Sequence, residues 1–225
     1  MQRDIQLDPY EARLFGVLIE KALTTPEQYP LSINAATNGA NQKSNRDPIL
    51  SLEEDQVAMA LERLVQKYLA RKVFPANSRV EKYCHNGKDG LGLDTRELAI
   101  MAELLMRGPQ SAGELRTRVS RMQAIESLDA LAALLTPLIE KGFVKRLPPS
   151  PGSRAERFVQ LLSPDLHPLD APQPAYVGAA PDNAHPISTP IADLAARLEQ
   201  VEAEVERLRQ RCHALAAKLG QSFDD

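Results

Sequence analysis

Leu64-Val-Gln-Lys-Tyr-Leu-Ala-Arg-Lys-Val73 decides the fold, because Leu138-Ile-Glu-Lys-Gly-Phe-Val-Lys-Arg-Leu147 repeats its pattern further along the chain. A second match, of Ser78-Arg-Val-Glu-Lys-Tyr83 with Ser153-Arg-Ala-Glu-Arg-Phe158, follows at an offset only one residue longer. Two matches at nearly the same offset predict one structural unit that is present twice. The alternative is a pair of unrelated small α+β pieces.

The first copy opens with a clear helix signal. Asp8 offers an N-cap, Pro9 suits the first helical position and Glu11 the third. Pro26 should stop this helix, because proline cannot continue the backbone hydrogen-bond pattern. Its expected apolar stripe consists of Leu14, Phe15, Val17, Leu18 and Ile19.

The rest of the first copy reads as two more helices and a hairpin. A short helix is expected over residues 31–41, and a third should start at the capping box Ser51-x-x-Glu54. Two short strands, Ala70–Phe74 and Arg79–Tyr83, should surround a tight polar loop. The expected buried face of the third helix consists of Val57, Ala60, Leu61, Leu64 and Tyr68.

The second copy repeats this order. Capping boxes at Asp94-x-x-Glu97 and Ser111-x-x-Glu114 start its first two helices. Leucines 128, 131, 135 and 138 stripe a third helix, and strands are expected at Val144–Leu147 and Arg157–Leu161. Three helices followed by a hairpin are typical of a winged helix. The fold class predicted is therefore mainly α with small β-hairpin wings: two tandem winged-helix units plus a C-terminal coiled-coil helix.

The predicted domains are a first winged helix at 1–90, a second at 91–163, a linker at 164–190 and a coiled-coil helix with a short tail at 191–225. Seven prolines between Pro164 and Pro190 indicate an extended, semi-rigid linker. Beyond it, apolar residues recur at alternating spacings of three and four, which is a heptad seam. The seam, and the predicted homodimer contact, consists of Ile191, Leu194, Leu198, Val201, Val205, Leu208, Cys212, Leu215 and Leu219. The alternative is a helix that folds back on its own chain.

Composition points to a cytoplasmic protein. No stretch of the chain is long and apolar enough for a signal peptide or a membrane span, and two cysteines cannot form a disulfide framework. The net charge is -3, and residues 1–90 carry as many acidic as basic residues. Charge alone therefore gives little support to nucleic-acid binding.

No enzyme signature is present, so we expect no catalysis, cofactor or metal. Phosphate-binding loops and nucleophile motifs are missing from the sequence. Cys84 and His85 are adjacent, but no second pair at metal-ligand spacing accompanies them. They are expected to be a structural or surface pair at a strand end.

The most suggestive polar cluster is the turn between the second and third helices of the first copy. Such side chains can contact phosphates and base edges, although asparagines there also suit a purely structural turn. Basic residues in the second copy and at both predicted wings extend this set. The candidate nucleic-acid-binding residues are Asn41, Gln42, Lys43, Asn45, Arg46, Arg79, Lys82, Arg116, Arg118, Arg121, Arg154 and Arg157.

Duplex DNA in a regulatory or chromosome-associated role is the partner first predicted. Against it, the third helix of the first copy starts with Glu53, Glu54 and Asp55, and that of the second with Glu126 and Asp129. These carboxylates would repel phosphates. The alternative function is protein–protein docking without direct DNA binding, as by the winged-helix subunits of bacterial chromosome-condensation complexes.

The motifs Thr24-Thr-Pro-Glu-Gln-Tyr-Pro-Leu-Ser-Ile-Asn34, Asn41-Gln-Lys-Ser-Asn-Arg46 and Gly113-Glu-Leu-Arg116 resemble the YceH-type family of uncharacterised bacterial proteins. The resemblance covers both predicted winged helices and, more loosely, the coiled coil. It implies tandem winged helices in a Gram-negative-type cytoplasm and no catalytic residues. The family's frequent Ala-Cys before Asn-Gln-Lys is here Gly39-Ala40, so no role for that cysteine carries over.

The heptad seam predicts that the full chain is a dimer. Truncation after Pro190 should weaken the dimer, and so should Leu208→Asp, because the substitution would bury a charge in the seam. Sedimentation measures the effect directly, and a wild-type monomer at high protein concentration would rule the seam out. Oxidative cross-linking through Cys212 reports orientation, because only parallel pairing brings the two thiols together.

Overall fold

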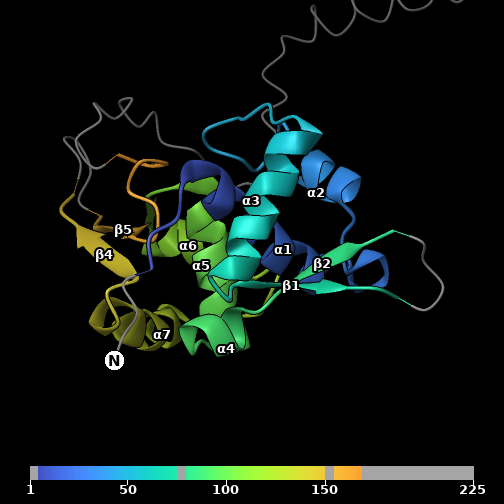
Figure 1. Ribbon diagram of the computed structural model, residues 1–225. Coiled ribbons are helices and arrows are strands. Elements are labelled where there is room, and N and C mark those ends of the chain that lie inside the picture. The colour runs from blue at the N-terminus through green and yellow to red at the C-terminus, as the bar shows by residue number, and fades with distance from the viewer. Residues whose placement is uncertain (1–4, 76–79, 150–154, 169–225) are drawn as a thin grey trace, which may run out of the picture. The chain divides into compact units, whose positions relative to one another are not determined.

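Two helices that are buried on every side, α1 (Pro9–Thr24) and α5 (Thr95–Arg107), lie at the centre of the computed structural model (Figure 1). The structure describes residues 5–75, 80–149 and 155–168, all within the first of two compact units, Met1–Pro172. Ten consecutive residues of each central helix are buried. A helix buried on all faces needs neighbours on all sides, and the remaining elements supply them.

Local sequence fixes where α1 begins and ends. The Asp8 carboxylate accepts hydrogen bonds from the backbone N–H groups of Tyr10 and Glu11, and the Glu11 carboxylate accepts one from the Asp8 N–H. This reciprocal cap satisfies donors that the first helical turn would otherwise leave unpaired. The helix ends at Thr24, before Pro26, as the sequence predicted.

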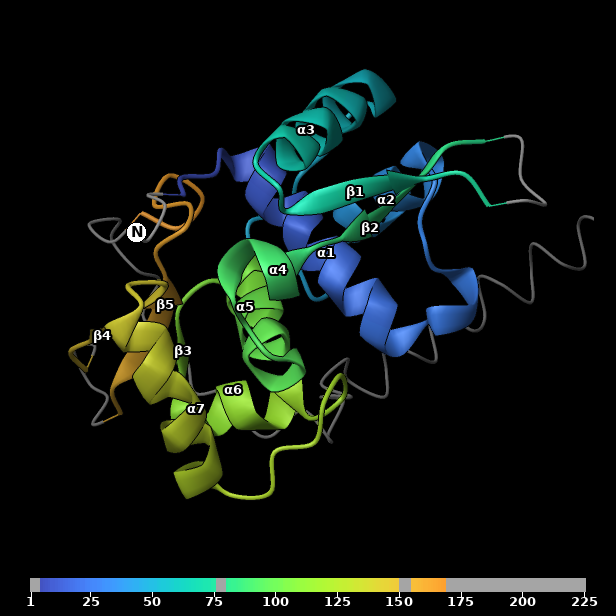
Figure 2. The same ribbon diagram turned by 60° about the horizontal axis from the view of Figure 1, so that its bottom comes forward.

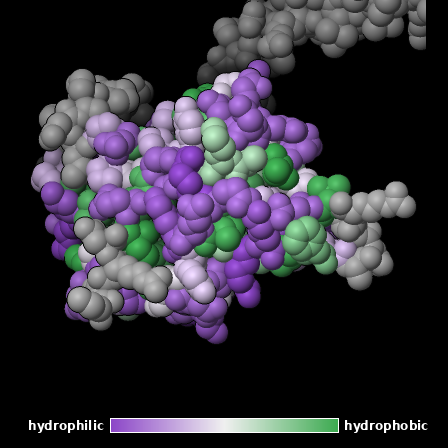
Figure 3. Space-filling model, viewed as in Figure 1, coloured by the Kyte–Doolittle hydropathy of each residue, from purple (hydrophilic) through white to green (hydrophobic). Residues whose placement is uncertain are grey.

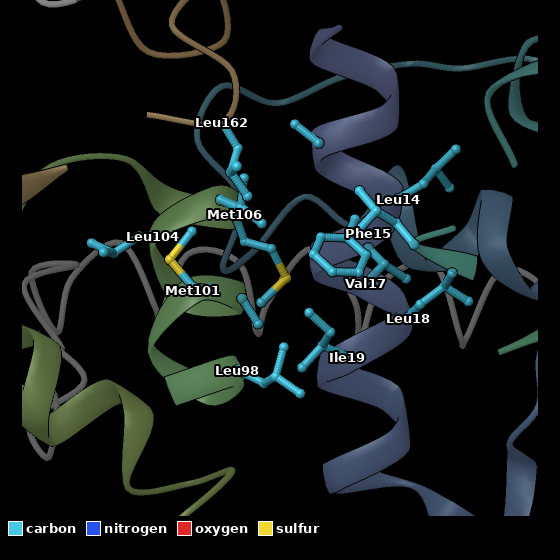
Figure 4. Packing of buried hydrophobic residues seen from close by; sticks show 14 of the residues in the cluster. Leu14, Phe15, Val17, Leu18, Ile19, Leu98, Met101, Leu104, Met106 and Leu162 are labelled. Carbon is cyan, nitrogen blue, oxygen red and sulfur yellow. The ribbon is translucent and has the colours of Figure 1, made fainter. Parts of the chain in front are cut away.

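The two central helices pack closely because Gly16 lies where they meet. A Cβ atom at Gly16 would stand 3.0 Å from the Met106 side chain and 3.4 Å from the Ala102 carbonyl oxygen. Figure 4 shows Phe15 and Ile19 on the side of α1 that faces α5, with Met106 and Leu98 directed back between the helices. One hydrophobic cluster therefore includes residues from both predicted copies.

The first half of the described chain covers one side of α1. After the short 3-10 helix η1 (Pro26–Gln28) come α2 (Ile33–Ala40) and α3 (Glu54–Gln66), then the strands β1 (Ala70–Val73) and β2 (Lys82–His85). These strands pair antiparallel, with Ala70 opposite His85.

The second half surrounds α5 (Figure 2). It comprises α4 (Gly87–Leu91), β3 (Gln110–Ser111), α6 (Ala112–Val119), α7 (Leu128–Glu140), β4 (Val144–Leu147) and β5 (Arg157–Gln160). The capping boxes predicted at Asp94 and Ser111 are both present, and β4 has the predicted bounds.

The two sheets share one arrangement that the sequence analysis missed. In the first half, the segment ahead of α2 forms a bridge between Leu31 and Tyr83 of β2. In the second half, β3 precedes α6 and pairs with β5, which gives the strand order β3-β5-β4. Each hairpin therefore carries an extra bridge or strand on the same side.

Several predicted boundaries in the first half are wrong. The short helix expected over residues 31–41 begins at Ile33, because Leu31 pairs with Tyr83. The helix expected from the Ser51 box begins instead at Glu54, and the Glu53 N–H donates to the Gln56 side chain. Backbone groups of Leu52 are held by the Asn41 side amide, which keeps Ser51 outside the helix. The strand expected at Arg79–Tyr83 lies at 82–85, because Tyr83 exchanges two backbone hydrogen bonds with Leu31 and so sets the register.

Two residues expected to be buried are exposed. Tyr68 lies in the turn after α3 with a φ of 66°, so its side chain leaves the apolar stripe and is 65% exposed. Leu128 is the first residue of α7 and is 51% exposed. The other positions predicted for these two stripes are buried.

The described residues form a mainly helical structure with two small antiparallel sheets. Within them, no helix is both long and apolar enough to cross a membrane. The predicted linker beyond residue 168 and the predicted coiled-coil helix lie outside the described residues.

The close contact at Gly16 predicts that Gly16→Val lowers the free energy of unfolding by about 1–3 kcal/mol, because the added methyl groups overpack the α1–α5 contact. Gly113→Ala is the matched control, since nothing lies within 4 Å of a Cβ at this helical position. It should be neutral or add up to about 1 kcal/mol through helix propensity. Urea unfolding of both variants makes the comparison, and equal stability would refute the close contact.

Candidate functional site

The polar segment Asn41–Pro48, here called the 41–48 loop, connects α2 to the chain leading into α3. The Asn41 side amide donates to the Leu52 carbonyl oxygen and accepts from the Leu52 N–H, both at 2.8 Å. Asn45 adopts a left-handed conformation, with a φ of 60°, which asparagine tolerates better than most residues. The loop is therefore shaped by its own asparagines.

Arg46 points from this loop into the protein interior, and its side chain is fully buried. Its guanidinium group lies 2.6 Å from a carboxylate oxygen of Glu20 on α1. It also donates to the carbonyl oxygens of Gly39 and Asn45 and to the side-chain oxygen of Gln42. These bonds compensate for removing a charged group from water.

The pair extends into a larger ion cluster, defined here as Glu20, Arg46, Glu103, Arg107 and Arg121. Arg121, which follows α6, lies 3.4 Å from Glu20 and 3.1 Å from Glu103 of α5. Glu103 forms a further ion pair with Arg107 at 3.2 Å, and Arg107 donates to the Asn45 side chain. The cluster therefore joins α1, the 41–48 loop, α5 and the end of α6.

Neutral groups of the same loop make further contacts that connect these elements. The Asp47 N–H donates to the Met106 carbonyl oxygen of α5 at 2.8 Å. The Asp47 carbonyl oxygen lies 2.7 Å from Nε2 of His167, which belongs to the last described segment. Burial lowers the pKa of His167, so the neutral ring that donates to Asp47 is favoured.

Arg13 on α1 binds the two ends of the loop. Its guanidinium donates to the carbonyl oxygens of Ala40 and Pro48, the latter at 2.6 Å. Burial, with the nearby positive charge of Arg46 acting in the same direction, lowers the pKa of Arg13 to about 10. The cation is thus retained at neutral pH and held by carbonyl oxygens.

The chemistry of this region is that of a structural joint. Both cluster carboxylates bind guanidinium groups inside the protein, an arrangement that fixes positions and offers no free base to a substrate. Among the described residues, no group of three His, Cys, Asp or Glu side chains could hold a metal ion.

The structure describes ten of the twelve predicted nucleic-acid-binding residues, and among these Arg46 and Arg121 both contact Glu20. Lys43 is exposed on the loop, and Lys82 lies at the start of β2. Arg116 reaches the carbonyl oxygens of Ile125 and Glu126, and Arg118 contacts the Gln110 side chain. Five other predicted residues make the internal contacts described above: Asn41, Gln42, Asn45, Arg46 and Arg121.

Three of the predicted nucleic-acid-binding arginines have not yet been described. Arg157 lies on β5 in the second sheet. Arg79 and Arg154 lie outside the described residues, as do all the predicted dimer-seam residues from Ile191 to Leu219.

The sequence analysis missed Glu20, Glu103 and Arg107 as members of the joint. Glu20 and Glu103 interrupt strongly apolar helices that are buried on every face, and such a helix has no solvent side for a carboxylate. A charged residue in this setting needs a partner, which is the signal that could have identified them.

The fold and joint define a class of protein: two helix-and-hairpin halves that share one core and one internal ion cluster. Residues 7–153 match the family described as "Protein of unknown function, DUF480". A UPF0502 protein of Hahella chejuensis is 42% identical over 96% of this chain and 98% of its own length. Another, of Koribacter versatilis, is 44% identical over 90% of each chain. The chain belongs to this family, which confirms the resemblance to YceH-type proteins.

The ion cluster predicts that Glu20→Gln lowers the free energy of unfolding by about 3–5 kcal/mol, because it leaves the buried Arg46 cation without its counter-charge. Glu156→Gln is the control. Glu156 pairs with Arg146 at 3.4 Å, but both side chains are more than half exposed, so the loss should stay below about 1 kcal/mol. Chemical unfolding measures both variants. If the two variants lose similar amounts of unfolding free energy, the ion cluster is not the principal electrostatic contact.

Proposed function

We propose that this chain is a tandem winged-helix protein without catalytic activity, which docks onto another protein. Each half runs helix, short extended segment, helix, helix and hairpin, which is the element order of a winged helix. The shared position of the extra strand or bridge, Leu31 in one half and β3 in the other, supports a duplicated unit.

The observation that carries the docking proposal is the exposed acidic start of α3. Glu53, Glu54 and Asp55 are all exposed there, at the helix that contacts the major groove in many helix-turn-helix proteins. The phosphate backbone would be repelled by three carboxylates. In the second half, Glu126 and Asp129 are exposed at the start of α7.

The internal contacts of the arginines support the same proposal. Arg46 would have to leave Glu20 to bind a phosphate, and a buried charge would then be left unpaired. Arg118 is engaged by Gln110 and Arg116 by backbone carbonyl groups, so both would have to exchange existing contacts for new ones.

Duplex DNA is the second candidate partner, favoured by one feature. The ion cluster holds three guanidinium groups for two carboxylates, and the Arg121 side chain at its edge is 33% exposed. Lys43 is exposed on the loop that carries Arg46. A basic edge of this kind could contact backbone phosphates without a recognition helix.

Self-association through residues 191–219 completes the proposal. The match to the Hahella chejuensis relative covers 96% of this chain, so it extends into the segment that carries the heptad seam. A parallel pair of such helices would present two copies of the docking surface, which raises avidity for a repeated or dimeric partner.

Full-length wild-type protein should not shift a short random-sequence DNA duplex at about 50 mM salt, where phosphate contacts are strong. The same protein, immobilised, should retain a partner protein from a nuclease-treated cell lysate. Charge reversal by Glu53→Lys with Asp55→Lys should abolish that retention, whereas Lys43→Ala should leave it unchanged. A salt-sensitive duplex shift that Lys43→Ala with Arg121→Ala diminishes would instead establish the DNA candidate.

A further inference from the structure

A groove of about 690 Å³ lies between the N-terminal ends of α2 and α3 and the start of β2. Its lining is Ser32, Ile33, Asn34, Glu54, Asp55, Val80 and Lys82. Sites for drug-sized ligands typically have volumes of about 300–1,000 Å³. The groove is therefore large enough for a few residues of an extended peptide and too small for a folded domain.

One wall of the groove is acidic and pre-arranged. The Asn34 side amide donates to the Glu54 carboxylate at 2.9 Å, which ties α2 to the first turn of α3. Asp55 follows in the same turn, where its carboxylate accepts from the Gln56 N–H. These carboxylates already complement the positive end of the α3 dipole, so an anionic ligand gains nothing there.

The opposite wall combines apolar surface with a single cation. Val80 is 57% exposed and Phe74, on the other arm of the hairpin, is 73% exposed. On the face in Figure 3, hydrophilic residues cover much of α3, whereas hydrophobic surface appears along the hairpin. Phe74 lies outside the lining of the groove, so Ile33 and Val80 supply the apolar surface within the groove itself.

We propose that this groove binds an extended segment of another protein in which lysine or arginine alternates with aliphatic residues. The inference rests on the proposed docking function and names the chemistry of its partner. Charge complementarity decides the occupant, because Glu54 and Asp55, with Glu53 beside them, outnumber Lys82. The segment's cations face the α3 wall, and its aliphatic side chains cover Ile33 and Val80.

The probe is a fluorescein-labelled synthetic peptide in which Arg alternates with Leu, titrated against the full chain by fluorescence anisotropy. Two matched peptides serve as controls, one with Glu in place of each Arg and one with Ser in place of each Leu. Binding of the first peptide, with both controls at least about tenfold weaker, is the expected result.

Variants of the full chain test the groove itself. Glu54→Gln with Asp55→Asn should weaken peptide binding about five- to twentyfold, because each partly exposed ion pair contributes a factor of about two to five. Val80→Ser should weaken it about fivefold through lost apolar contact. Asp89→Asn with Asp165→Asn makes the same change in net charge at exposed positions outside the groove and should leave the affinity unchanged.

Equal binding of the acidic peptide, or equal loss in the Asp89 and Asp165 variant, would overturn the proposal. If the Glu54→Gln with Asp55→Asn variant still retains the protein that the wild type captures from nuclease-treated lysate, the groove inference fails, while the docking proposal stands. If the peptide binds as expected but no protein is retained from lysate, the groove chemistry is supported and the broader docking function is what fails.

Discussion

The rest of the structure depends on how the carboxylate of Glu20 is neutralised. It lies on a helix with no solvent face, and a buried carboxylate without a partner costs several kcal/mol, so it must be paired. Arg46 provides the counter-charge from 26 residues further along the chain. To reach it, the 41–48 loop must turn inward, which fixes the end of α2 and, through the Asn41 contact with Leu52, the approach to α3. Arg121 then extends the same charge network to Glu103 on α5.

Apolar contacts and ion pairs both connect the two halves, so neither half can be considered separately. The contact around Gly16 is tight but built from side chains that many sequences could supply. The ion cluster is specific, because each arginine needs a carboxylate at a set distance and direction. Arg46 and Arg121, two basic residues that would suit a nucleic acid, form ion pairs with Glu20, whereas the start of α3 exposes Glu53, Glu54 and Asp55.

Much of the fold was predictable from local sequence, because capping boxes and apolar periodicity act over a few residues. Asp8, Asp94 and Ser111 each start a helix where predicted. The predicted start of α3 and the predicted bounds of β2 were wrong because distant groups decide them, namely the Asn41 amide and the Leu31 backbone. The candidate site was predicted in part: its turn was identified, but the inward direction of Arg46 depends on Glu20, with which no periodic pattern connects it. Lys82 was selected for its charge, whereas the groove around it comes from three separate elements.

A partner that docks as proposed would meet a surface whose geometry is already set. The contact of α1 with α5 at Gly16, together with the ion pairs of Arg121 to Glu20 and Glu103, ties the two halves to each other. Association therefore does not have to order the halves first, and less binding free energy is lost to conformational entropy. The same rigidity makes recognition selective, because a ligand that spans both halves must match one spacing and cannot draw the protein into a new shape.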